Sequence, residues 1–343
     1  MAKRKKKKQT RWAVIILIVV FALAALFSYR WFLDNRMQAF ANNGVIRIRP
    51  NTTIEELEQQ IEENLKPLHK ASLRRVFEDE DVAGKMCPGR YAVDSTFSAR
   101  RFARAVTHGW EEPVNLVLSG RMRSVEDVAE KISLQMMVGK EEMLDALTDS
   151  ILLIKYRTTP SKVFEMIIPD TYQMYWSASV TEILARMKME YYAYWTEERI
   201  ADAAKQGLTP SQVSVLASII AEESHYKDEY PKIASVYLTR LRSGMKLQAC
   251  PTVCYIYNYK LKRVLNRHLR AKSPYNTYIY AGLPPTPICV PDKAHLDAVL
   301  HPDETPYKYF CADSRLNGRN VFSVSLSEHN RKAALYRNAL KSR

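Results

Sequence analysis

Residues 12–29 constrain the fold more than any other stretch, because they form an apolar run of 18 residues without a charge, a proline or a glycine. About 20 such residues span the hydrocarbon core of a bilayer. Trp12, Tyr29 and Trp31 stand near the ends of the run, where aromatic side chains favour the membrane interfaces. We therefore expect a single transmembrane helix over residues 12–33.

The segment before this run sets the expected topology. Residues 1–11 carry seven Lys and Arg and no acid, and basic flanks of this kind stay on the cytoplasmic side. We expect a basic cytoplasmic tail over residues 1–11, a single pass through the plasma (inner) membrane, and an extracytoplasmic or periplasmic remainder. A cleaved signal peptide, cut near Ala22-Leu23-Ala24, is the alternative. The apolar run exceeds the 7–15 residues usual in signal peptides and continues past that triplet, which favours an uncleaved anchor.

The net charge of +14 raises the question of a nucleic-acid partner. Seven of these charges lie in the tail, which leaves +7 over the other 332 residues. Such a mildly basic surface suits any anionic polymer, so no nucleic acid is predicted as a partner. The five cysteines are an odd number and lack a second Cys or His pair at zinc-site spacing. We predict neither a metal nor a cofactor.

The length of 343 residues suits about two domains beyond the anchor. Short strand and helix signals alternate after Gly44. The segment Val45–Arg49 reads as a strand closed by proline, and Thr53 with Glu56 forms a capping box that starts a helix. A second strand signal covers Val114–Leu118. This order predicts a small α+β module over residues 44–160.

The apolar stretch Leu216–Ser224 ends in two adjacent acids, Glu222 and Glu223. Helical spacing places Leu216, Ile219 and Glu223 on one face. Burial raises the pKa of a carboxylic acid, which is how an enzyme keeps one protonated near neutral pH. Glu223 is therefore a candidate acid–base group. The simpler interpretation is that Glu223 marks the end of the buried face and points to water.

The segments around this helix carry further local signals. Thr209 and Pro210 predict its first turn, and Asn317-Gly318 predicts a hairpin. Proline-studded loops between residues 247 and 287 are the kind of segment that holds substrate contacts. A last helix is expected over about residues 326–340. An aromatic-rich segment before the central helix could line a glycan groove or pack in the core; its residues are Tyr172, Tyr175 and Trp176.

A series of motifs spread in order over about 120 residues resembles the YceG-like endolytic murein transglycosylases (MltG). Upstream, the resemblance weakens to a Pro-Gly-x-Tyr turn and a Pro-Asp-Thr triplet. The motifs that carry it are Leu216-Ala-Ser-Ile-Ile-x-x-Glu223, Ile233-Ala-Ser-Val-Tyr-Leu-x-Arg-Leu241, Gly244-Met-x-Leu-Gln248, Pro251-Thr-Val-x-Tyr255, Ser273-Pro-Tyr-Asn-Thr-Tyr278, Gly282-Leu-Pro-Pro285, His301-Pro302, Thr305-Pro-Tyr-x-Tyr-Phe310 and His329-Asn330.

The resemblance implies an α+β enzyme with one N-terminal membrane anchor, a LysM-like module within residues 44–160 and a catalytic domain over residues 161–343. It implies cleavage of the MurNAc–GlcNAc bond of nascent peptidoglycan glycan strands, with 1,6-anhydro-MurNAc ends left behind and strand elongation terminated. It places the catalytic position on Glu223, as general acid and then general base, and not on Glu222. Glu222 lies about 100° round the helix and is expected to be a solvated neighbour. It also implies work beside glycan-polymerising penicillin-binding proteins.

Two positions depart from the family pattern. Ala221 stands where the family often has a second acid, so either that acid is dispensable or Glu222 or Glu229 substitutes for it. Cys250 stands where the family usually has Asp. The polar groups expected to orient the sugar are Gln248, Thr252, Tyr275 and Asn276, and each could equally hold a loop in shape.

These departures leave one alternative from another class of protein. An inactive, membrane-tethered wall-binding scaffold would keep the glycan groove and lose turnover. Such a scaffold would bind glycan without cleaving it, whether or not Glu223 is replaced.

Overall fold

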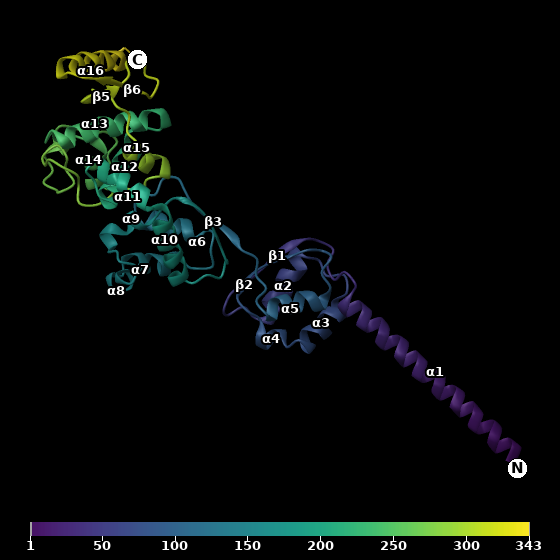
Figure 1. Ribbon diagram of the computed structural model, residues 1–343. Helices are drawn as coiled ribbons and strands as arrows, with labels where there is room; N and C mark the ends of the chain where they lie inside the picture. Colours follow the sequence, from purple (N-terminus) through teal and green to yellow (C-terminus); the bar gives the residue numbers. More distant parts are fainter. Residues whose placement is uncertain (1, 343) are drawn as a thin grey trace. The chain divides into compact units, whose positions relative to one another are not determined.

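The computed structural model describes residues 2–342, with side chains from residue 11 onward (Figure 1). It is a mixed α+β structure, as expected, and its chain forms two compact units. One unit contains the residues up to Asn115 together with Gln173–Ser177, and the other contains 116–172 and the chain from Ala178 onward. The functional limits expected at residues 44–160 and 161–343 remain a proposal.

The first unit begins with the long helix α1 (Ala2–Asn35). Its segment Arg11–Asn35 contains an 18-residue window with a mean hydropathy of 2.6, none of which is buried in the protein, so the segment is long and apolar enough to cross a membrane. The helix end is fastened to the unit by Asp34, which is buried and accepts hydrogen bonds from Ser72 and Arg75.

A two-stranded antiparallel sheet and four helices form the rest of this unit. Strand β1 (Gly44–Ile48) pairs with β2 (Gly89–Val93), with Ile46 opposite Tyr91. The predicted capping box at Thr53 and Glu56 starts α2 (Ile54–Asn64), because each residue's side chain bonds the other's backbone N–H. The remaining helices are α3 (Lys70–Asp79), α4 (Val82–Lys85) and α5 (Ala99–Thr107).

The next elements along the chain are short. Strand β3 (Val114–Leu118) pairs with β4 (Asp170–Met174). The helices between these strands are α6 (Val125–Ser133), α7 (Lys140–Thr148), α8 (Ser150–Ile154), η1 (Pro160–Lys162) and α9 (Val163–Met166).

Helix α12 (Pro210–Glu223) is the centre of the second unit. Its first turn is closed by the expected capping box of Thr209 and Gln212. Every residue from Val213 to Ile220 is buried, so the helix is enclosed on all sides and does not present a single apolar stripe. The helices in contact with it include α11 (Glu197–Lys205), α13 (Tyr230–Arg242), α14 (Cys250–Ile256) and α15 (Lys293–Leu300).

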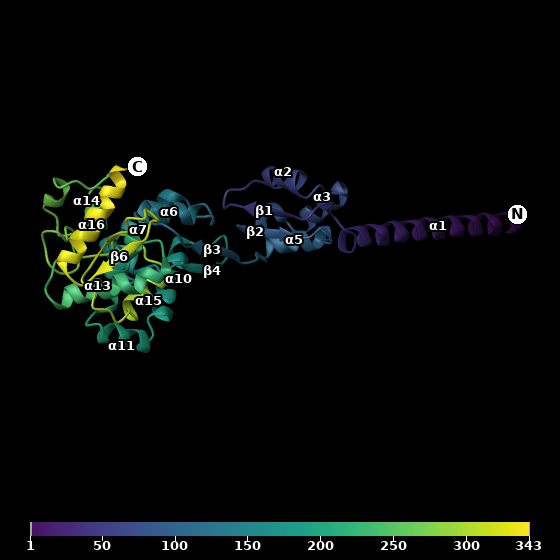
Figure 2. The ribbon, with the colours of Figure 1, turned by 90° about the horizontal axis from the view of Figure 1, so that it is seen from above.

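The chain ends with a hairpin and a helix. Strands β5 (Tyr309–Ala312) and β6 (Asn320–Ser323) are antiparallel, with Ala312 opposite Asn320. The expected turn contains Gly318 in the left-handed region at φ 77°. Helix α16 (Leu326–Lys341) packs on both strands (Figures 1 and 2). The unit also contains α10 (Val180–Tyr194), η2 (Lys227–Glu229) and η3 (His268–Arg270).

Candidate active site

The last residue of α12 is Glu223, and its side chain lines a pocket of about 480 Å³. Volumes in this range are usual for sites that hold a ligand. The pocket is built from α12, α13, the loop before α14, the β5–β6 hairpin and α16. Its lining residues are Glu223, Tyr237, Arg240, Leu247, Gln248, Cys250, Tyr278, Phe310, Cys311, Ala312, Asn320 and His329.

The carboxyl of Glu223 has one short polar contact, a hydrogen bond of 2.8 Å donated by the Tyr237 hydroxyl to Oε1. Burial at the end of an apolar helix raises the pKa of Glu223 to about 7. The Tyr237 hydrogen bond and the positive charge of Arg240 pull that pKa down, and neighbouring Glu222 pushes it up. Near neutral pH the group can therefore both give and take a proton.

Tyr237 and Arg240, which counteract the effect of burial on the pKa of Glu223, lie three residues apart on one face of α13. Burial and the nearby Glu223 raise the pKa of Tyr237 well above its ordinary value, so its hydroxyl remains a donor. Arg240 is buried and donates Nη1 to the Leu247 carbonyl at 2.6 Å and Nε to the Lys308 carbonyl at 2.8 Å. Arg240 thus fixes both the loop before α14 and the approach to β5 around the acid.

Among the pocket-lining residues, Glu223 is the one carboxylate. Glycosidases that use water or a covalent intermediate need two carboxyl groups facing each other across the sugar. In the part of the chain that the structure describes, no cluster of His, Cys, Asp and Glu could hold a metal ion. The pocket therefore suits chemistry that one carboxyl group can complete.

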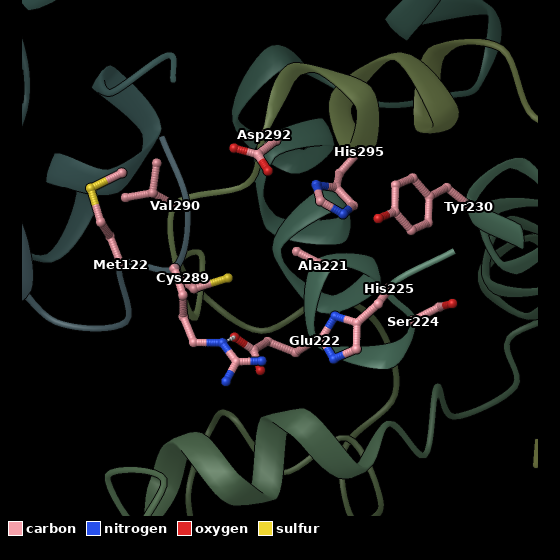
Figure 3. Close-up of a pocket in the computed structure, with 12 residues that line it drawn as sticks. Met122, Ala221, Glu222, Ser224, His225, Tyr230, Cys289, Val290, Asp292 and His295 are labelled. Carbon is pink, nitrogen blue, oxygen red and sulfur yellow. Dashed lines mark ion pairs between the residues drawn. The ribbon is translucent and has the colours of Figure 1, made fainter. Parts of the chain in front are cut away.

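The neighbouring acid, Glu222, points into a different and smaller pocket of about 170 Å³ (Figure 3). Its two oxygens accept from Arg123, with Nε at 2.8 Å and Nη2 in a second contact. Only 6% of the Glu222 side chain is exposed. The expectation that Glu222 is solvated was wrong, because a buried acid must be paired and its partner lies 99 residues earlier in the chain.

The model of the YceG-like family matches residues 46–335. The chain belongs to the YceG-like family. A yceG-like protein of Listeria monocytogenes has a solved structure with a TM-score of 0.55 at 22% identity, over 84% of this chain and 98% of that one, which shows the same fold.

Two curated relatives of this YceG-like protein are named endolytic murein transglycosylase. The Bacillus subtilis protein is 38% identical over 168 residues, which are 49% of this chain and 44% of that protein. The Streptococcus pneumoniae protein (strain D39) is 24% identical over 182 residues, 50% of this chain and 32% of that one. The match thus spans less than half of the length of either relative.

Of the remaining residues predicted for the site of this YceG-like protein, Gln248 alone lines the pocket. Its backbone is in the left-handed region at φ 53°, and its N–H donates to the Thr277 carbonyl at 3.1 Å. Its side chain is exposed and free to meet a ligand.

Glu229 is buried behind the pocket and does not line it. Its oxygens accept from Ser224 Oγ at 2.8 Å, Asn320 N at 2.9 Å and Asn320 Nδ2 at 2.9 Å. It therefore ties the end of α12 to strand β6 and positions Asn320, which does line the pocket. It is not placed to substitute for the missing second acid.

Thr252, Tyr275 and Asn276 also lie outside the pocket lining. Thr252 Oγ1 is buried against the Ala249 carbonyl at 2.8 Å and Thr277 Oγ1 at 2.9 Å. The Tyr275 hydroxyl is 2.5 Å from Thr286 Oγ1. Asn276 is buried and bonds only backbone groups of its own loop. Their positions favour the structural alternative, which is that they shape the loops.

Several pocket residues were not foreseen as site residues. Tyr237 and Arg240 lie three residues apart on the helix that follows Glu223. This spacing was a usable signal, because a cation on a buried helix face must have polar partners. Tyr278 and Cys250 meet at 3.0 Å between Oη and Sγ. All five cysteines are free thiols.

The glycan groove considered for the aromatic segment is not supported for Tyr172 and Trp176, because both side chains are buried in the core.

The raised pKa of Glu223 makes folding stability depend on pH. Its pKa moves from 4.5 to about 7 on folding, so the folded state binds this proton more tightly. The resulting stability is complete below about pH 4.5 and is lost as pH rises through about 7. With allowance for partial exposure, the loss is about 2 kcal/mol. We expect the unfolding free energy of wild type to fall by this amount between pH 4.5 and 8, relative to Glu223→Gln. Parallel pH curves for the two proteins would contradict the assigned pKa.

Proposed function

We propose that this protein is a membrane-anchored lytic transglycosylase that cleaves the MurNAc–GlcNAc bond inside peptidoglycan glycan strands and leaves 1,6-anhydro-MurNAc ends. The observation that carries the proposal is a single carboxylic acid, with a pKa near 7, at the wall of a pocket large enough for a sugar. Membership of the YceG-like family and the names of the curated relatives support the same reaction.

The reaction needs one group that first donates and then accepts a proton. Protonated Glu223 gives its proton to the glycosidic oxygen, and the bond from that oxygen to C1 of MurNAc breaks. The carboxylate then takes the proton of the C6 hydroxyl while O6 bonds to C1 and closes the anhydro ring. No water is consumed, and Glu223 ends protonated as it began. A pKa near the working pH serves both halves of this cycle.

The groups around Glu223 have supporting roles in this proposal. The Tyr237 hydroxyl holds one carboxyl oxygen in place through its 2.8 Å bond, so the other oxygen faces the substrate. The positive charge of Arg240 stabilises the carboxylate between the two proton transfers. Gln248 and Asn320 present exposed or half-buried amides that can bond sugar hydroxyl or N-acetyl groups.

The location of the enzyme follows from helix α1. The apolar segment Arg11–Asn35 anchors the chain in the plasma membrane, with the basic tail in the cytoplasm and the chain after Asn35 on the other side of the membrane. We propose that the antiparallel β1–β2 pair and the helices between its strands act as a LysM-like glycan-binding module. Glycan-polymerising enzymes remain expected partners, and co-purification in detergent would test this.

Direct assay of the full chain tests the proposed reaction. Purified glycan strands are incubated with detergent-solubilised protein, and the products are analysed by mass spectrometry. Internal cuts with anhydro ends are expected. Binding without turnover, by wild type and Glu223→Gln alike, would instead favour the scaffold.

The contact between Tyr237 and Glu223 predicts a shift in the pH dependence of cleavage. Cleavage by wild type should fall as pH rises through about 7, because the first step needs protonated Glu223. Tyr237→Phe removes a hydrogen bond that lowers this pKa, so the fall should move to higher pH. Tyr278→Phe is the matched control, since its hydroxyl bonds Cys250 instead. An unchanged midpoint in Tyr237→Phe, or a lower one, would contradict the role given to this hydroxyl.

A further inference from the structure

The positive charge of this protein is concentrated in two short segments. The net charge is +14; residues 1–11 carry seven, and residues 260–272 carry six with no acid, which leaves one for the rest of the chain. The net charge beyond the tail is therefore not spread evenly over the chain, since six of its seven positive charges lie in residues 260–272. The six cations of the second segment are Lys260, Lys262, Arg263, Arg267, Arg270 and Lys272.

These cations lie in the loop of residues 257–276, here called the basic loop, which follows α14 (Figures 1 and 2). All six side chains are exposed. None is in an ion pair with any described acid. Cations that lack acidic partners repel one another, so their accumulation costs stability unless a ligand uses it.

Helix α14 and the basic loop together leave the wall of the Glu223 pocket and return to it. Two contacts join the start of α14 to the residues that follow the loop: Gln248 N donates to the Thr277 carbonyl at 3.1 Å, and Cys250 Sγ lies 3.0 Å from Tyr278 Oη. Gln248, Cys250 and Tyr278 all line the pocket. The basic loop therefore ends directly before residues of the pocket wall.

The basic loop has a defined shape despite its exposure. Asn276, completely buried, donates Nδ2 to the Leu269 carbonyl at 3.0 Å and to the Ala271 carbonyl at 2.8 Å. The buried ring of His268 packs on Tyr257 at 5.2 Å between centroids. Of the two roles expected for Asn276, orienting the sugar or holding a loop in shape, these bonds favour the second.

We propose that the basic loop binds carboxylates carried by the peptide stems of the glycan strand, and so selects charged, peptide-bearing strands for the Glu223 pocket. This inference rests on the proposed function, since it assumes that a peptidoglycan strand occupies that pocket. A strand threaded through the pocket passes the loop, and its stems present negative charges at intervals along the polymer.

The arrangement of the cations favours spaced charges over one compact anion. A site for a single pyrophosphate would hold buried, convergent donors. Here six exposed cations are distributed over 13 residues, and of these six only Arg267 makes a side-chain hydrogen bond, from Nε to His268 Nε2 at 3.2 Å. Each exposed ion pair with a ligand contributes little on its own, and salt weakens it further.

Equilibrium binding with the full-length Glu223→Gln protein tests the inference without any need for cleavage. The probes are glycan strands with native stem peptides and the same strands whose carboxylates are capped as neutral methylamides. Capping is expected to raise Kd about tenfold at low salt and to have little effect at high salt. Replacing Lys262, Arg263 and Arg270 by Gln should raise the Kd for native strands by the same factor as capping does. Native and capped strands should then bind this variant with the same Kd.

The matched control removes three exposed cations outside the loop, with Lys155, Lys162 and Arg331 replaced by Gln. It should bind both probes as the parent does. Equal binding of native and capped strands by the parent would overturn the inference, as would equal losses in the loop and control variants. Loop-dependent binding only to strands with a terminal pyrophosphate would overturn the carboxylate assignment. Failure of wild type to form anhydro ends would instead count against the proposed reaction, because the binding result does not depend on it.

Discussion

Replacing Glu223 by glutamine is expected to slow glycan cleavage by about 10²–10⁴-fold, the usual effect of losing general acid–base catalysis. Glutamine keeps the size of the side chain and can still meet the Tyr237 hydroxyl, but it has no proton to give to the leaving oxygen. Strand binding should change little, because the loss concerns proton transfer. The rate of release of anhydro-ended fragments by purified full-length protein measures this effect.

Glu222→Gln is the matched control for this experiment, because it alters the adjacent residue in the same way. Glu222 faces the smaller pocket and is paired with Arg123. Its amide variant should therefore retain most of the cleavage activity. Comparable losses in the two variants would show that the helix end matters as a whole, and that Glu223 has no special part in the chemistry.

Removing the partner of Glu222 is expected to destabilise the protein strongly. In Arg123→Ala the Glu222 side chain, 6% exposed, loses both hydrogen bonds to the guanidinium. Removing one partner of a buried ion pair costs about 3 kcal/mol. Thermal or denaturant unfolding of the full chain, compared with wild type, measures the loss.

Arg121→Ala separates this pair from a general loss of positive charge. Arg121 is 4.0 Å from Glu222 and its side chain is 54% exposed, so its removal should cost well under 1 kcal/mol. Adding Glu222→Ala to Arg123→Ala should recover part of the lost stability, because the unpaired acid is then gone. Equal effects of the two arginine variants, or no recovery in the double variant, would show that the ion pair does not stabilise the fold.

Local chemistry made much of the fold predictable. The capping boxes at Thr53 and Thr209 are satisfied within four residues of sequence, so the two helix starts could be located before the structure was known. The hairpin turn at Gly318 is a local signal of the same kind. Helices α7 and α8 were harder to locate: the N-cap of α7, Gly139, offers no side-chain cap, and α8, although capped by the Asp149 side chain, is only five residues long.

The candidate site was predictable only in part, because its members meet through tertiary contacts. Glu223 became a candidate because of its position on an apolar helix and because of the family resemblance, and its side chain lines the pocket. Glu222 was misjudged because its partner lies 99 residues away, a separation that no periodicity reveals. Asn320 and His329 reach the pocket through the pairing of β5 with β6 and the packing of α16. Thr252 and Asn276 are polar residues that the fold uses to close loops, and polarity alone could not separate that use from ligand binding.

The most direct test of the account is cleavage of glycan strands by the full-length protein in water enriched in heavy oxygen. If Glu223 serves as acid and then base for the C6 hydroxyl, every new MurNAc end is a 1,6-anhydro ring, lighter than a reducing end by one water and free of the heavy isotope. New reducing ends that carry heavy oxygen would mean that water attacks C1, and the single-carboxylate mechanism would then be wrong.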